Sequence, residues 1–194
     1  MTTLSTFCRR REILAHRVRS IAQRKASHVK NINGSFINNH SGYAFKSRID
    51  LSEDLESICY KVAKETNNII PVFVSYEHTR ITPYSAIIEQ MPLDGHNIDE
   101  LLGQMQLNQK SVLFCASGLS NVYSHPIAKE IWPQLHALIT GYYNTVILTD
   151  THPDFLMMIE GERYWRELRE KYGVVLPSLN DTKITHIDLD KFLD

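Results

Sequence analysis

Four positions carry side chains that could do chemistry at the ends of predicted strands or at the start of a predicted helix. Ser47, Ser117 and Asp150 lie at or near the ends of predicted strands, and Glu130 lies in the first turn of a helix predicted over 126–142. In sheets of parallel strands, ligands bind at the carboxyl ends of the strands. These residues therefore predict a polar ligand site at that edge, although each could also be an ordinary solvated or backbone-bonded side chain.

The elements that must position these residues alternate from Tyr43 onward. The predicted strands are 43–49, 69–76, 111–116, 145–149 and 184–187. The predicted helices are 51–66, 98–107, 126–142 and 162–172. The polar segment 77–96 is broken by prolines, and a short extended piece is expected over 86–88. Strand–helix alternation at this spacing predicts an α/β fold with a doubly wound, mainly parallel sheet.

Charge divides the 194-residue chain into an extension and a body. Residues 1–48 hold ten Lys or Arg and one acid, for a net charge of +9, whereas the remaining residues carry −10. Residues 4–27 have the pattern of a basic amphipathic helix, and 31–42 read as a linker rich in Asn, Ser and Gly. The expected domains are a basic helical extension with its linker over 1–42 and an α/β domain over 43–194.

The partner of the basic extension is open on sequence alone. Residues 1–30 could meet nucleic acid or an anionic membrane, or could form a mitochondrial transit peptide. We favour docking in cis, because a strongly positive segment beside a strongly negative body already has a partner.

Several function classes lack their usual sequence features. The longest apolar runs, such as 69–74, are far shorter than the roughly 20 residues that cross a bilayer. The three cysteines are unclustered and no His-x-x-x-His pair occurs, so neither a disulfide framework nor a structural metal is expected. No phosphate-binding glycine loop is present, and Ser117-Gly118 lacks the earlier glycine of a nucleophile elbow. We expect no metal and no bound cofactor.

Motifs follow one another in a fixed order between residues 43 and 175. They are Tyr43–Arg48, Asp94–Leu101, Ser111–Ser117, Lys129–Ile131, Asn144–Asp150 and Arg163–Leu168. They read as an aromatic–serine strand end, a turn that opens a helix, a buried strand ending in serine, a helix with a glutamate, a further strand, and an aromatic pair. In this order the set resembles the Toll/interleukin-1 receptor (TIR) domain family, including its bacterial NAD-cleaving members.

The resemblance implies a flavodoxin-like, TIR-like sheet and an NAD+ glycohydrolase or cyclase, with NAD+ as substrate. It implies Glu130 as the catalytic carboxylate. We expect Phe45, Ser47, Arg48 and Ser117 to bind the nucleotide, Ser117 because it ends a strand and Arg48 because a cation in the first loop after a strand can meet a pyrophosphate. It also implies a homo-oligomer or contacts with other TIR domains, and a cytoplasmic protein of defence signalling or a secreted effector.

Two departures from the family pattern bear on the activity. Arg48 stands where the family usually has a tyrosine, and Pro126-Ile127 stand where it has Trp-Cys before the glutamate. Those aromatic residues often line the nicotinamide pocket in NAD-cleaving members. A non-catalytic TIR scaffold or adaptor is therefore the alternative function, with the segment between Tyr76 and Asp94 as its interaction loop.

The expected chemistry needs a single carboxylate. Nicotinamide leaves the ribose of NAD+ as a neutral molecule, so cleavage needs no strong acid. A carboxylate beside the anomeric carbon stabilises the positive charge that grows on the sugar and can hold the ribose hydroxyls. We favour the enzymatic interpretation, with hydrolysis or cyclisation at the ribose–nicotinamide bond.

Overall fold

The computed structural model describes residues 4–30, 42–90, 110–141, 144–160 and 184–192, together with positions 100, 103, 108, 166, 170 and 171. Strands in these ranges form one sheet in the order β2-β3-β4-β1-β5, and every neighbouring pair is parallel. The strands are β1 (Gly42–Lys46), β2 (Ile69–Ser75), β3 (Ser111–Ser117), β4 (Thr145–Asp150) and β5 (Ile184–Asp188).

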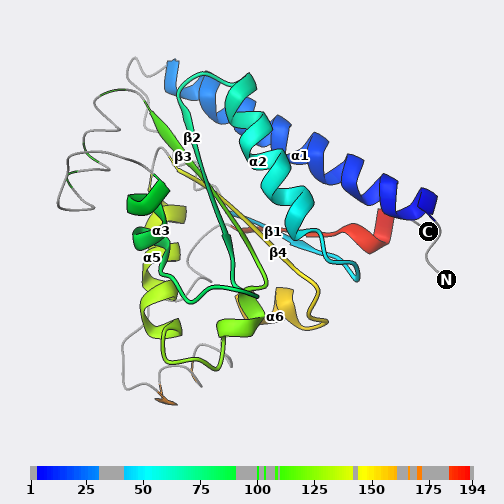
Figure 1. Ribbon diagram of the computed structural model, residues 1–194, viewed down its shortest axis with the longest axis vertical. Helices are drawn as coiled ribbons and strands as arrows, with labels where there is room; N and C mark the ends of the chain where they lie inside the picture. Colours follow the sequence, from blue (N-terminus) through cyan, green and yellow to red (C-terminus); the bar gives the residue numbers. More distant parts are fainter. Residues whose placement is uncertain are drawn as a thin grey trace.

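Helices cover both faces of this sheet (Figure 1). They are α1 (Leu4–Lys30), α2 (Ser52–Glu65), α3 (Pro83–Gln90), α5 (Ala128–Thr140) and α6 (Phe155–Glu160), with 3-10 turns η1 (Leu119–Val122) and η3 (Leu189–Phe192). α1 and α2 lie on one face, and α3 and α5 lie on the other. The predicted α/β class with a doubly wound parallel sheet is therefore confirmed.

The order of the strands differs from that of the flavodoxin-like sheet that the family resemblance implied. Flavodoxin-like sheets run 2-1-3-4-5, whereas here β1 lies between β4 and β5, and β2 forms an edge beside β3. Strand–helix alternation requires each crossover to return parallel. The alternation does not determine how many strands each crossover passes over. The sequence pattern therefore predicts a sheet covered by helices, but not the order of the strands within that sheet.

Residues 83–90 form a helix, where the sequence predicted a short extended piece over 86–88. Pro83 occupies the first helical position, which tolerates proline because the missing N–H would have no partner there. Ala86 and Ile87 are fully buried against the sheet. The prolines of this segment mark the start of a helix rather than an irregular loop.

Two apolar cores lie on the two faces of the sheet. Phe114 of β3 faces the core under α3 and α5 together with Trp132, whereas the adjacent Leu113 and Cys115 face the core under α1 and α2. Every residue of β3 and β4 is buried. Continuous burial of both faces explains why these strands read as unbroken apolar runs.

The basic helix α1 docks on the body of its own chain. Leu14 and Val18 are fully buried in the core that α1 shares with α2. The charged face makes three ion pairs with the body: Arg10 with Asp190 (2.7 Å), Arg11 with Asp54 (2.7 Å) and Arg19 with Glu65 (3.0 Å). The predicted docking in cis is confirmed.

Several predicted features lie outside the described residues. They are the linker over 31–41, most of the helices over 98–107 and 162–172, and most of the motifs Asp94–Leu101 and Arg163–Leu168. Among the helices that the structure does describe, none has the length and apolar character needed to span a bilayer.

The Arg10–Asp190 pair is expected to hold α1 on the body. Both side chains are largely buried, with exposed fractions of 7% and 14%, so Arg10→Ala leaves a desolvated carboxylate without its partner. We expect the free energy of unfolding, measured by urea denaturation, to fall by about 3 kcal/mol. Arg19→Ala removes an ion pair that is 39% exposed on each side and should cost less than about 1 kcal/mol. Equal losses of unfolding free energy in the two variants would contradict the assignment of Arg10–Asp190 as a buried ion pair that holds α1 on the body.

Candidate functional site

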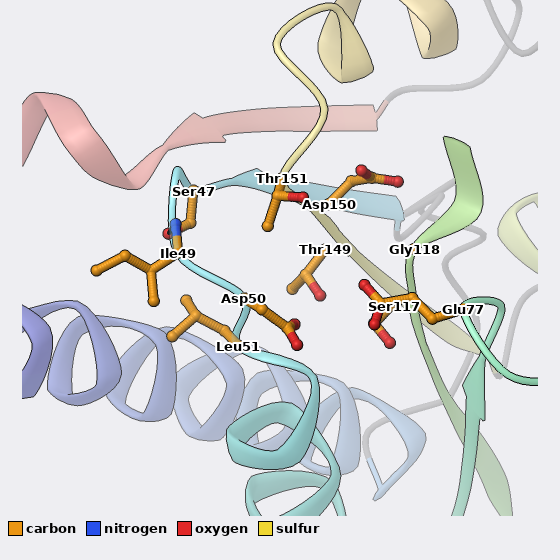
Figure 2. Close-up of a pocket in the computed structure, with 10 residues that line it drawn as sticks. All are labelled: Ser47, Ile49, Asp50, Leu51, Glu77, Ser117, Gly118, Thr149, Asp150 and Thr151. Atoms are coloured by element: carbon orange, nitrogen blue, oxygen red, sulfur yellow. Dashed lines mark hydrogen bonds between the residues drawn. The ribbon is translucent and has the colours of Figure 1, made fainter. Parts of the chain in front are cut away.

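A small cavity that opens to solvent lies where the carboxyl ends of the parallel strands meet. Its walls come from the loops that follow β1, β2, β3 and β4 (Figure 2). The lining residues are Ser47, Ile49, Asp50, Leu51, Glu77, Ser117, Gly118, Thr149, Asp150 and Thr151. The edge of the sheet predicted to hold a ligand therefore does carry a cavity.

The loop between β1 and α2 places a carboxylate at the start of α2. Asp50 Oδ1 accepts hydrogen bonds from the backbone N–H of Ser52 (2.9 Å) and from the Ser52 hydroxyl. A negative side chain at a helix N-terminus is stabilised by the helix dipole. Ser47 contributes to the same loop, because its Oγ accepts from the Ile49 N–H (3.1 Å). Asp50 therefore supplies the accepting oxygen at the start of α2.

The end of β3 depends on a glycine that lets a second carboxylate approach. Gly118 adopts a left-handed backbone with φ of 66°, which L side chains rarely adopt. A Cβ at this position would lie 2.6 Å from Cγ of Glu77. Only glycine therefore allows the Glu77 side chain to lie over the end of β3 beside Ser117.

Ser117 leaves a buried polar atom without a partner. The residue is 1% exposed, and its Oγ makes no hydrogen bond although it lines the cavity. Buried hydroxyls are nearly always hydrogen-bonded, because an unpaired one loses its contacts with water. Figure 2 shows the Asp50 carboxylate pointing across the cavity toward Ser117 and Glu77. A ligand that donates or accepts there would complete the site.

Asp150 organises the loop after β4. Its carboxylate accepts from the Ser120 N–H (2.7 Å), the Ser120 hydroxyl (2.8 Å) and the His152 N–H (2.8 Å). His152 in turn accepts from the Asp154 N–H (3.1 Å), so Asp150, His152 and Asp154 form a bonded turn. Within the described residues, no group of His, Cys, Asp or Glu is arranged to hold a metal ion.

The cavity is acidic and rich in hydrogen-bond acceptors. Its ten lining residues include the carboxylates Asp50, Glu77 and Asp150, and no Lys, Arg or His is among them. Glu77 is exposed and has no hydrogen bond or ion pair to the described residues. The arrangement therefore suits a ligand that carries hydroxyl or amine donors, or a positive charge.

The structure brings two of the predicted site residues together at the cavity. Ser47 and Ser117 line it, as the strand-end rule predicts. Phe45 is fully buried in the core under α1 and α2, because its side chain points into the sheet face that those helices cover. Arg48 directs a side chain that is 85% exposed toward Asp190 and does not line the cavity.

Glu130 is exposed on the first turn of α5 and is not among the cavity-lining residues. The next two residues of α5, Ile131 and Trp132, are buried in the core. Successive helical residues are about 100° apart, so the position before a buried pair falls on the solvent face. Sequence reasoning did not name Asp50 and Glu77, which lie in the loops after β1 and β2 and could have been found by the same strand-end rule.

Cys115 lies two residues before Ser117 and takes no part in the cavity. It is fully buried, and burial raises the pKa of its thiol. A raised pKa disfavours the reactive thiolate. Cys115 is therefore an inert residue of the core under α1 and α2.

No protein-family model and no curated protein matches the chain. Two solved structures show a weak likeness to it. One is a chain of the structure of Drosophila ORC bound to AT-rich DNA and Cdc6, with a TM-score of 0.47, 10% identity, and coverage of 92% of this chain and 58% of that one. The other comes from the structure of Drosophila ORC bound to GC-rich DNA and Cdc6, with a TM-score of 0.45, 10% identity, and coverage of 92% and 59%. The chain thus spans less than two thirds of either.

Alanine is expected to change the free energy of unfolding in opposite directions at Gly118, which is crowded by Glu77, and at Gly103, which has open space around it. Gly118→Ala places a Cβ 2.6 Å from Glu77 on a left-handed backbone and should lower the free energy of unfolding by about 1–2 kcal/mol or more. Gly103→Ala, at a helical position with open space around the added Cβ, should raise it by up to about 1 kcal/mol. Urea denaturation of both variants checks the pair; a neutral Gly118→Ala would contradict the crowding of Glu77 against β3.

Proposed function

We propose that this cavity binds the ribosyl group of a nicotinamide nucleoside or nucleotide and hydrolyses the ribose–nicotinamide bond, the bond that the family resemblance implied would be cleaved in NAD+ by a glycohydrolase or cyclase. The observation that carries the proposal is the unpartnered Ser117 hydroxyl, 1% exposed, in a cavity with the carboxylates of Asp50 and Glu77. A ribose supplies hydroxyls that can donate to the carboxylates and pair with Ser117.

The chemistry matches an acidic cavity. As the bond from C1′ to the pyridinium nitrogen breaks, its electron pair goes to that nitrogen, and nicotinamide leaves neutral. Positive charge then grows on the ribose, and a fixed carboxylate nearby lowers the energy of that state. Water forms the new bond to C1′, and its proton passes through a carboxylate to solvent.

Glu77 is the carboxylate to which we assign the electrostatic role. It lines the cavity and is free of bonds to the described residues, so its charge is available to a ligand. Asp50 is engaged with the start of α2, and Asp150 accepts three hydrogen bonds from its own loop. Glu130, the carboxylate that the family resemblance implied, is exposed on α5.

A non-catalytic adaptor is the second candidate, and the size of the cavity favours it. The cavity is small and opens to solvent, whereas most small-molecule sites enclose roughly 300–1,000 Å³. In this candidate function the chain binds other domains of its own kind, and the roles in defence signalling and in the cytoplasm that the resemblance implied remain predictions.

Nicotinamide release from NAD+ and from nicotinamide riboside, followed by chromatography, tests the proposal. We expect Glu77→Gln to lower the rate on the order of a hundredfold, because it removes the carboxylate to which we assign stabilisation of the charge on the sugar. Glu130→Gln makes the same chemical change at an exposed position outside the cavity and should leave the rate within about twofold of the wild type. A larger loss of rate in Glu130→Gln than in Glu77→Gln would restore Glu130 as the catalytic residue. A wild-type protein that releases no nicotinamide would contradict the hydrolase and favour the non-catalytic adaptor.

A further inference from the structure

We infer that the cavity selects a positively charged riboside without phosphate groups, such as nicotinamide riboside, over phosphorylated relatives such as NAD+. The inference rests on the proposed function, because it names the substrate class of the same cavity. It follows from three features of the described residues: the occupied start of α2, the absence of cations from the cavity wall, and the unpartnered Ser117.

The position where a phosphate would bind is taken by the chain itself. In α/β sheets, a helix that follows a strand presents free N–H groups to phosphate at its N-terminus. At the start of α2, the Ser52 N–H and hydroxyl donate to Asp50 instead (2.9 Å for the N–H). A phosphate there would have to displace a bonded carboxylate of the same charge sign.

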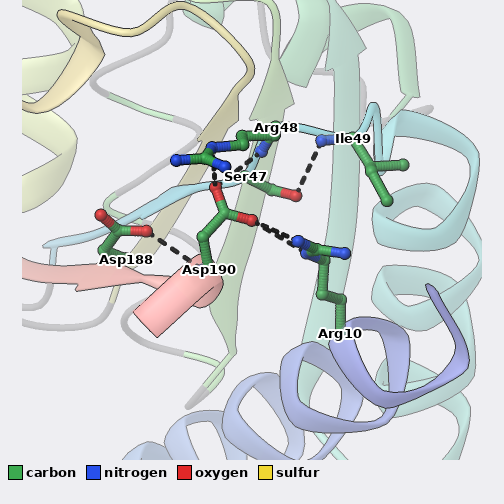
Figure 3. Close-up of polar contacts among 6 residues, drawn as sticks. All are labelled: Arg10, Ser47, Arg48, Ile49, Asp188 and Asp190. Atoms are coloured by element: carbon green, nitrogen blue, oxygen red, sulfur yellow. Dashed lines mark hydrogen bonds and ion pairs between the residues drawn. The ribbon is translucent and has the colours of Figure 1, made fainter. Parts of the chain in front are cut away.

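The nearest arginine is held away from the cavity. The backbone N–H of Arg48 donates to Asp190 Oδ2 (3.0 Å), and its guanidinium lies 3.7 Å from the same oxygen with the side chain 85% exposed. Arg10 fixes Asp190 through Nε and Nη2, at 2.9 and 2.7 Å from Oδ1 (Figure 3). The ion pair between Arg10 of α1 and Asp190 of η3 therefore keeps Arg48 on the outside of the β1–α2 loop.

The other arginine close to the edge is also engaged. Arg80 donates from Nη1 to the carbonyl oxygens of Tyr76 (2.6 Å) and Thr79 (2.9 Å), and it is not among the lining residues. No guanidinium among the described residues is therefore placed to hold a pyrophosphate at the cavity. A phosphate ester entering it would meet carboxylates without a compensating cation.

A riboside cation meets the opposite situation. Its pyridinium charge is attracted by Asp50 and Glu77, and its ribose hydroxyls donate to carboxylates or pair with Ser117 Oγ. The riboside is also smaller than NAD+, so less of it has to be accommodated at a small cavity. Charge and size thus favour the same class of substrate.

The experiment is an NMR titration of the full chain at low ionic strength, in a cooled sample, with nicotinamide riboside, nicotinamide mononucleotide and NAD+. The amide of Gly118, which donates to the Thr149 carbonyl beside the cavity (3.1 Å), reports binding. We expect the riboside to bind at least tenfold more tightly than the mononucleotide, which differs by one phosphate. Glu77→Gln should narrow this ratio, and Glu130→Gln, an equal change of charge on the exposed face of α5, should leave it unchanged.

The outcomes separate this inference from the proposed function. A riboside that binds with the expected preference but is not cleaved supports the selectivity and contradicts the hydrolase. Equal or tighter binding of the mononucleotide or NAD+ overturns the selectivity, even if the bond is cleaved. A riboside that leaves the Gly118 amide unperturbed also overturns it. Asp50→Asn also removes a negative charge from the cavity and should narrow the same affinity ratio. Circular dichroism checks that α2 still forms in that variant.

Discussion

Parallel pairing of β4 with β1 on one side and β3 on the other is the constraint on which the rest of the structure depends. It brings the ends of three strands to one edge, in the register Lys46 opposite Asp150 and Ser117 opposite Thr149. Polar side chains, which are rare on the helix-covered faces of the sheet, gather at this edge, and each buried one needs a hydrogen-bond partner. Asp150 finds partners in its own loop, whereas Ser117 does not. Ser117 and Asp150 both line the cavity at this edge.

Asp190 connects this edge to both ends of the described chain. It accepts from Arg10 of α1 and from the backbone of Arg48 in the β1–α2 loop, and it lies in η3 directly after β5. A pair this far from solvent is costly to break, because either partner alone would be a desolvated charge. The loop that carries Ser47 and Asp50 is thus braced from outside by α1 and η3. The basic helix is a structural part of the body as well as the partner of its acidic surface.

Features that follow from local periodicity or from net charge could be predicted from the sequence. The covered strands β3 and β4, the class of the fold, the docking of α1 and the place of Ser47 and Ser117 at the ligand edge belong to this group. Features that depend on which way a side chain turns could not. Glu130 is exposed because the next two residues of α5 are buried, and Arg48 points outward because Asp190, 142 positions later, accepts its N–H.

The order of the strands also needed the structure, because alternation of strands and helices does not state which strands become neighbours. The two carboxylates Asp50 and Glu77 could be identified as cavity residues only from the structure, for another reason. Glu77 lies in a polar loop that reads as solvated, and it reaches β3 only because position 118 is a glycine with φ of 66°. Asp50 precedes a helix and looks like an ordinary capping residue until its position beside Ser117 is known.

A crystal structure of the full chain with nicotinamide riboside tests the central claim most directly. The account predicts the ribose at the ends of β1, β3 and β4, with its hydroxyls within hydrogen-bond distance of Ser117 Oγ and the Glu77 carboxylate and the pyridinium ring facing Asp50. A riboside bound beside Glu130 on α5, or a cavity that stays empty at saturating ligand, would contradict it.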